Sequence, residues 1–261
     1  NLHYEQLEAA RVDLGSRSDF VPATQSQLPG SPLAANDTAG IITTRAAAEA
    51  FFSAGTNRRM LRFLAINHLC RDMEDLHDPS LPADRVRQDI TRSPGGDSSL
   101  YLNSCVGCHD GMDPMAGAFA YLDWQPGDPD NSALSGRLVH TPGQVRAKYL
   151  QNGNAFPFGF VTTSNRWDNY WREGRNSLLE WPDTASGGFG PKSLGSEIAN
   201  SRAFAVCQVE KVFEQVCFRP DSNQTDRAAI ETIADTFMQD GYRLKRVFAR
   251  VADYCTLPDA N

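Results

Sequence analysis

The amino-acid sequence predicts a mostly α-helical fold, and three features of its hydrophobic pattern lead to this prediction. Apolar residues recur at helical spacing through the last quarter of the chain and again between residues 57 and 76. Between residues 111 and 195 glycine, proline and aromatic residues dominate, and no alternating pattern indicates a β-strand. We therefore expect a helical module, an irregular connector rich in aromatic residues, and a C-terminal three-helix domain.

These patterns divide the chain of 261 residues and 28.7 kDa into four expected parts. Residues 1–40 are expected to form an N-terminal arm and residues 41–125 a helical module that carries a cysteine motif. Residues 126–190 are the expected connector, and residues 191–261 the C-terminal helical domain.

Individual helices are expected where caps and apolar spacing agree. In the N-terminal half these are residues 4–12, 45–52 with Thr44 as N-cap, 57–76, and a helix that follows a cap at Asp97 or Ser98. In the connector, Thr141 and Gln144 have the spacing of a capping box, with Pro142 between them, which predicts a short helix to about Gln151. The C-terminal helices are expected over residues 201–218, 225–239 and from Leu244 past Val251.

Composition and charge exclude several classes of partner. The formal net charge of −7 disfavours a nucleic-acid backbone. The longest apolar stretches are a few residues, so no transmembrane helix is expected. The first residue is Asn1 and no signal segment precedes the fold, so we expect a mature chain from which any export signal has been removed.

One motif carries chemistry: Cys105-Val106-Gly107-Cys108-His109, the attachment sequence of c-type haem. Two thiols three positions apart on a helical turn can add across the two vinyl groups of one porphyrin, and the next residue then places its imidazole beneath the iron. By composition, a chance match has a probability of about 0.003. The motif predicts one covalent haem c, bound through Cys105 and Cys108, with His109 as the proximal iron ligand.

Three other interpretations of the motif remain. A thioredoxin-like dithiol would follow a β-strand in a βαβ unit, and no such pattern is visible. A structural zinc site usually needs a second closely spaced pair, whereas the other four cysteines are scattered. A disulfide within the motif would leave His109 unexplained.

The distal iron ligand is harder to assign from one sequence. Met112 and Met115 follow His109 too closely for the chain to round the porphyrin edge. Of the remaining histidines and methionines, His77 at a helix end and His140 before an expected helix cap are the favoured distal candidates. An iron with no distal ligand is the alternative. Arg85, Arg87 and Arg92 could pair with the haem propionates, or they could form a solvated basic face.

The four single cysteines favour an oxidising compartment, because haem c is attached after export and spare cysteines in exported proteins usually form disulfides. Cys207 and Cys217 share one expected helix, about 15 Å apart along its axis, too far to bond. If the last three helices run up, down and up, Cys217 and Cys255 lie at the same end. This predicts Cys217–Cys255 and, by elimination, Cys70–Cys207. Free buried thiols are the alternative.

Several further segments resemble a known family. They are residues 39–43 and 57–59, the stretch Met112-Asp113-Pro114 with Asp123 after the haem motif, and residues 201–207, 218–220 and 240–244. Together they are similar to the planctomycete-type cytochrome c proteins. The resemblance implies a helical, exported, electron-transfer protein with one haem c. Family members commonly carry further upstream helical domains, which this chain begins too late to hold, so we expect its redox partners to be other subunits of a complex.

The leading functional hypothesis is an exported, periplasmic or extracellular, mono-haem cytochrome c that transfers single electrons, an electron carrier rather than a catalyst. A haem enzyme of peroxidase type is the first alternative, and it would need an open distal position with an acid–base group nearby. A structural haem-bearing subunit of an assembly is the second alternative. The sequence does not identify the reduction potential, the electron donor and acceptor, or the oligomeric state.

Overall fold

The structure is a computed structural model that describes residues 4–13, 15, 22–28, 30–53, 55, 57–87, 105–128, 135–150 and 158–256. As expected, it is mostly helical. The α-helices are α1 (Tyr4–Ala9), α2 (Arg45–Phe51), α3 (Arg58–His68), α5 (Val106–Ala116), α7 (Gly190–Ala199), α8 (Arg202–Cys217), α9 (Gln224–Gln239) and α10 (Leu244–Thr256). Short 3-10 helices are η2 (Gln25–Gln27), η3 (Gly40–Thr43), η5 (Gly117–Phe119), η7 (Ala147–Tyr149), η8 (Tyr170–Arg172) and η9 (Gly174–Leu179).

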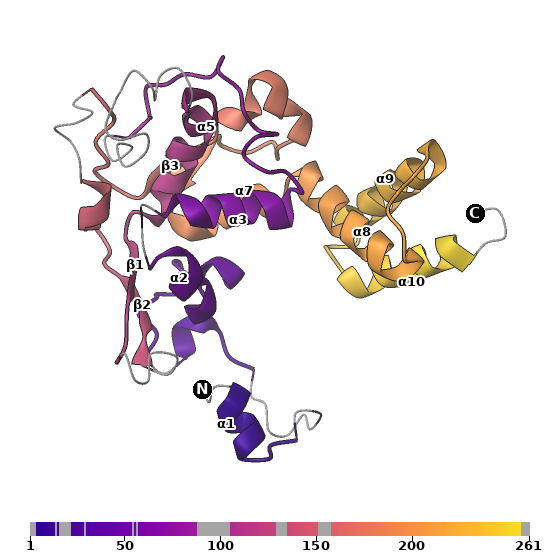
Figure 1. Ribbon diagram of the computed structural model, residues 1–261, viewed down its shortest axis with the longest axis horizontal. Helices are drawn as coiled ribbons and strands as arrows, with labels where there is room; N and C mark the ends of the chain where they lie inside the picture. Colours follow the sequence, from indigo (N-terminus) through magenta and orange to yellow (C-terminus); the bar gives the residue numbers. More distant parts are fainter. Residues whose placement is uncertain are drawn as a thin grey trace.

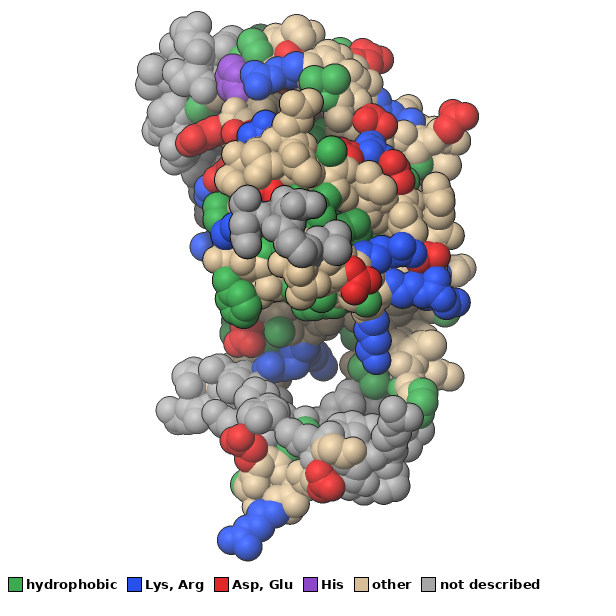
Figure 2. All heavy atoms as spheres, turned by 90° about the vertical axis from the view of Figure 1, so that its right-hand side faces the viewer, with side chains coloured by type: hydrophobic (Ala, Val, Ile, Leu, Met, Phe, Trp, Pro, Cys, Tyr) green, Lys and Arg blue, Asp and Glu red, His purple; other side chains and the backbone are tan. Residues whose placement is uncertain are grey.

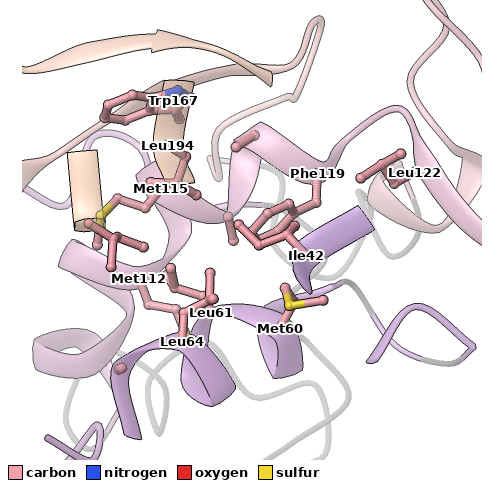
Figure 3. Packing of buried hydrophobic residues seen from close by; sticks show 14 of the residues in the cluster. Ile42, Met60, Leu61, Leu64, Met112, Met115, Phe119, Leu122, Trp167 and Leu194 are labelled. Atoms are coloured by element: carbon pink, nitrogen blue, oxygen red, sulfur yellow. The ribbon is translucent and has the colours of Figure 1, made fainter. Parts of the chain in front are cut away.

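The main hydrophobic core lies between α2, α3, α5 and α7 (Figure 1). Figure 3 shows Leu61 and Leu64 of α3 facing Met112 and Met115 of α5. Trp167 and Trp171, from the expected connector, are 2% and 1% exposed and belong to the same core. The aromatic segment therefore packs against the helix that carries the cysteine motif.

A second hydrophobic cluster is enclosed by α8, α9 and α10, which extend to one side of the main core (Figure 1). Two disulfides fix these helices. Cys70, just after α3, bonds to Cys207 on α8, with 5.3 Å between the Cα atoms. Cys217 at the end of α8 bonds to Cys255 on α10, with 5.6 Å between the Cα atoms. Both pairings are as the sequence predicted.

Among the described residues, four short strands form two antiparallel pairs, which the sequence did not predict. β1 (Leu122–Gln125) pairs with β2 (Arg137–His140), and β3 (Arg166–Asp168) pairs with β4 (Gly187–Phe189). Each strand has only three or four residues, too few for an alternating pattern to stand out.

The expected helix over residues 57–76 is shorter in the structure. α3 ends at His68, because Leu69 is its C-cap and Cys70 turns into the left-handed region with a φ of 52°. Met73 and Leu76 lie in the turns that follow and are still buried in the core. Their spacing therefore matched that of a longer helix in the sequence.

The expected helix over residues 141–151 is absent where the structure describes this stretch. Gly143 has a φ of +77°, which breaks a helix, and only the three-residue η7 forms. In contrast, the predicted N-cap Thr44 is confirmed, since its side chain accepts a hydrogen bond from the Ala47 N–H. Asp97 and Ser98, the expected caps before the cysteine motif, lie outside the described residues.

None of the described helices is long and apolar enough to cross a bilayer. Figure 2 shows the face that carries α8, α9 and α10, where acidic and basic side chains are interspersed and hydrophobic side chains occur in small groups.

Candidate haem-attachment site

The first turn of α5 presents the three motif side chains. Cys105 is the N-cap, and Cys108 and His109 follow in the first helical turn. Both cysteines are free thiols and partly exposed. The side chains at the first, fourth and fifth positions of a helical stretch share one face, because three or four residues complete a turn. Cys105, Cys108 and His109 therefore form a contiguous donor set on one side of α5.

The imidazole of His109 is held by a carboxylate one turn further along α5. Its Nδ1 lies 3.0 Å from Oδ1 of Asp113. A carboxylate can only accept, so the proton sits on Nδ1 and the lone pair of the neutral ring sits on Nε2. This is the arrangement in which a ligating histidine is oriented and made more basic by a second group.

Asp113 is itself fixed by three further donors. Arg58 of α3 binds it through two nitrogens, with Nε to Oδ1 at 2.7 Å and Nη2 to Oδ2 at 2.9 Å. The backbone N–H of Arg87 donates to Oδ2 at 3.0 Å. Burial alone raises the pKa of the Asp113 carboxyl, but the charge of Arg58 and the hydrogen bonds from Arg58 and His109 outweigh it and hold this pKa well below its ordinary value. Asp113 is therefore an anion that anchors His109 to α3.

On the far side of α5, two glycines lie so close to neighbouring side chains that no larger residue would fit there. A Cβ on Gly111 would lie 1.8 Å from Nε1 of Trp171, and one on Gly107 would lie 2.5 Å from Nε2 of His77. The Asp78 N–H also donates to the Gly107 carbonyl at 2.8 Å. These contacts hold the first turns of α5 against their neighbours and leave the opposite face to the motif.

The two distal candidates lie away from that face. His77 rests on Gly107, which projects about 200° round the helix from Cys105. His140 ends β2 opposite Leu122, beyond the C-terminal end of α5, and its Nδ1 lies 3.9 Å from Oδ2 of Asp37. The structure therefore brings neither histidine to the side of the motif. Met112 and Met115, which the sequence places too close to His109 to be distal ligands, are buried in the core (Figure 3).

Asp110, the residue after His109, is an unusual buried carboxyl. It is 1% exposed, and neither carboxyl oxygen has a hydrogen-bond partner among the described residues. Burial, followed by the charges of Asp113, Asp78 and Asp84, raises its pKa to about 7. Close to neutrality this group carries its proton for part of the time, which lessens the cost of burying it.

The geometry disfavours the other interpretations of the motif. Within the described residues, no group of three or more His, Cys, Asp or Glu side chains is arranged to hold a metal ion. Burial and the neighbouring Cys105 raise the pKa of the Cys108 thiol, whereas a redox dithiol has a lowered one. The described strands form only antiparallel pairs, which lack the parallel sheet of a thioredoxin-like unit.

Of the three candidate propionate partners, Arg85 and Arg87 lie beside the site. Arg87 is 1% exposed, with its guanidinium 4.4 Å from the Tyr149 ring centre. The guanidinium of Arg85 lies 4.2 Å from the Phe160 ring centre and pairs with Asp168. Arg92 lies outside the described residues.

Sequence reasoning did not identify Asp113 and Arg58 as site residues. The four-residue spacing between His109 and Asp113 is the one local signal, since such pairs meet on a helix. Arg58 lies 55 positions earlier and only the tertiary fold brings it there.

Comparisons of the chain with protein-family models, with curated proteins and with solved structures found no match.

Proposed function

We propose that this chain is an exported mono-haem c-type cytochrome that transfers single electrons between redox proteins. The observation that carries the proposal is the donor set on α5: two free thiols one helical turn apart, followed by an imidazole with its proton held on Nδ1 by Asp113. Haem c, when bound, would supply an iron that cycles between Fe(III) and Fe(II).

The roles of the chain's own residues follow from this geometry. The Cys105 and Cys108 thiols would tether the porphyrin, and His109 would ligate the iron through Nε2. Asp113 and Arg58 fix the ring so that little rearrangement accompanies a change of charge. Supporting the wider proposal, the two disulfides suit a periplasmic or extracellular compartment.

The proposal also includes three more specific features. They are membership in the planctomycete-type cytochrome c proteins, which the sequence resembles, a haem-binding module over residues 41–125, and a C-terminal three-helix domain. The separate hydrophobic cluster of α8, α9 and α10 supports the last of these. Other subunits of a complex are the proposed redox partners.

The decisive experiment is expression with a cytochrome c maturation system, followed by a pyridine haemochrome spectrum and an intact mass. The wild type should show a c-type spectrum and a mass that exceeds the polypeptide by one haem. The double variant Cys105→Ala/Cys108→Ala should lose both. The matched control Cys217→Ala/Cys255→Ala also removes two cysteines, in the disulfide between α8 and α10, but should keep the haem. A wild-type mass equal to the bare polypeptide would refute the proposal.

A haem enzyme of peroxidase type is the second candidate, because the placement of the distal candidates is compatible with its open distal position, although it also leaves that position without a histidine as the acid–base group. His77 lies behind α5 and His140 beyond its far end, which leaves the distal position without either of them. A high-spin ferric spectrum and carbon monoxide binding after reduction would support the enzyme. A low-spin spectrum without carbon monoxide binding would support the electron carrier.

A further inference from the structure

A polar cavity of about 240 Å³ lies next to the haem-attachment site, with Asp113 in its wall. Its other polar lining comes from two segments far apart in the sequence, one with Arg85 and Arg87 and the other with Thr162, Thr163, Ser164 and Arg166. Asp113 also accepts a hydrogen bond from His109, so this single side chain lies between the cavity and the imidazole.

The segment over residues 85–87 connects this cavity to the cysteine motif. Val86 is 2% exposed and packs against Cys105 and Val106. Arg85 and Arg87, on either side of it, both line the cavity. The Phe160 N–H donates to the Val86 carbonyl at 2.6 Å, so this segment is also tied to the chain that supplies Thr162. The two segments of the cavity wall are therefore held in place by side-chain packing and by a backbone hydrogen bond.

The charged groups of the cavity wall are mainly positive. The wall holds the guanidinium groups of Arg85, Arg87 and Arg166 and the carboxylate of Asp113. A second carboxylate, on Asp168, pairs with both Arg85 and Arg166. Three guanidinium groups therefore line the cavity with one carboxylate, an arrangement that attracts an anion.

Two residues of the wall each have a buried polar side-chain atom with no hydrogen-bond partner among the described residues. These atoms are Oγ1 of Thr162, a residue only 4% exposed, and Nε of Arg85. A buried polar group without a partner costs free energy that an incoming acceptor would recover. An oxyanion is such an acceptor, and it would also balance the positive charge of the wall.

We propose that this cavity binds an oxyanion, a carboxylate or phosphate group, through Arg85, Arg87, Arg166 and the Thr162 hydroxyl. Two sources have this chemistry: a propionate of the attached haem, and a free anion from solution. The propionate source rests on the function proposed above, whereas the free-anion source does not.

The test uses the purified full-length protein, as obtained from the maturation strain, and two measurements. Calorimetric titration with inorganic phosphate, at constant ionic strength, reports a free anion. The propionate bending bands of the resonance Raman spectrum report hydrogen bonds to the haem propionates. Both are compared among the wild type, Thr162→Val, Arg166→Gln and a control, Arg227→Gln, which removes another exposed arginine paired with an aspartate.

Two results would support the proposal, one for each source. Saturable phosphate binding that weakens at least tenfold in Thr162→Val and Arg166→Gln, but not in Arg227→Gln, identifies a free anion. Absence of phosphate binding in the wild type, with Raman bands that shift in the two cavity variants alone, identifies a propionate. Phosphate binding insensitive to both cavity variants, or neither binding nor a band shift, would overturn the proposal.

The test can be interpreted even if a variant is destabilised or the protein lacks haem. Valine has nearly the shape of threonine, so Thr162→Val should melt at or above the wild-type temperature in phosphate-free buffer, because it removes a buried hydroxyl without a partner among the described residues. A protein that proves to lack haem refutes the cytochrome, while the phosphate titration still tests the cavity.

Discussion

Nδ1 of His109 lies 3.0 Å from Oδ1 of Asp113, one turn further along α5. The bond links the only imidazole of the cysteine motif to a carboxylate that Arg58 holds in the core. In a cytochrome this contact acts on the iron, because the negative charge of the carboxylate makes the imidazole a stronger donor and so favours Fe(III).

For the haem proposed above, replacing Asp113 with asparagine should therefore raise the midpoint potential. For one electron, a tenfold change in the stability of Fe(III) relative to Fe(II) corresponds to about 60 mV, and loss of an outer-shell carboxylate is expected to cause a shift of about that size. Potentiometric titration of Asp113→Asn against the wild type measures the shift. An unchanged or lower potential would show that Asp113 is structural only.

A matched control exists in the C-terminal helices. Asp226 is also fully buried and bonded to an arginine through two oxygens, with Arg219 at 2.6 and 2.9 Å. Asp226→Asn should lower the free energy of unfolding but leave the midpoint potential where it is. This comparison separates the effect of a lost buried ion pair from an effect transmitted through His109.

Much of the fold could be predicted from local signals. The apolar spacing of α8, α9 and α10, the Thr44 cap and the geometry that pairs Cys217 with Cys255 are all visible in the sequence. The end of α3 was missed because Met73 and Leu76 keep core positions in turns. The strand pairs were missed because three or four residues carry too little pattern.

The candidate site could be predicted only in part, because some of its residues come together only in the tertiary fold. The motif Cys105, Cys108 and His109 is contiguous, and so sequence alone identifies it. Arg58 and Thr162 reach the site through tertiary packing, which no local spacing reports. The distal ligand stays a prediction, with His77 placed behind α5 and His140 beyond its end.

Gly111 allows α5 to approach the aromatic segment, and adding a methyl group there should be costly. A Cβ would lie 1.8 Å from the indole nitrogen of Trp171, which is itself buried, so the ring or the helix must move. We expect Gly111→Ala to destabilise the protein by about 3 kcal/mol in denaturant unfolding.

Gly195, in the middle of α7, provides the matched control. A Cβ there would lie 3.4 Å from Cδ1 of Ile42 and 4.0 Å from Cβ of Ala39, both ordinary contacts. Since alanine is the better helix former, Gly195→Ala should be neutral or stabilise by up to about 1 kcal/mol. Equal losses in both variants would show that the Trp171 contact has no special role.

The two disulfides should differ in how much they stabilise the chain. Cys70–Cys207 closes a loop of 137 residues and Cys217–Cys255 a loop of 38. Loop-closure entropy gives upper values of about 5 and about 4 kcal/mol, respectively. The paired serine variants, unfolded in guanidinium chloride, should show the larger loss for Cys70→Ser/Cys207→Ser. The reverse order would indicate that the packing of side chains around each bond, rather than chain entropy, decides the difference.

The ion pair of Asp226 should make the unfolding of α8, α9 and α10 sensitive to acid. The carboxylate accepts hydrogen bonds from Arg219, the Ser222 N–H and the Tyr254 hydroxyl, and the Arg219 bond contributes most to lowering its pKa far below the ordinary 3.8. A lowered folded pKa gives stability that is complete above the unfolded pKa and is lost as the pH falls through the folded one. Stability should therefore decline from about pH 4 downward, and Asp226→Asn, already weaker by about 2–4 kcal/mol at neutral pH, should show a shallower decline. Urea unfolding followed between pH 2 and 7 measures both, and parallel curves for the two proteins would exclude Asp226 as the source of the acid sensitivity.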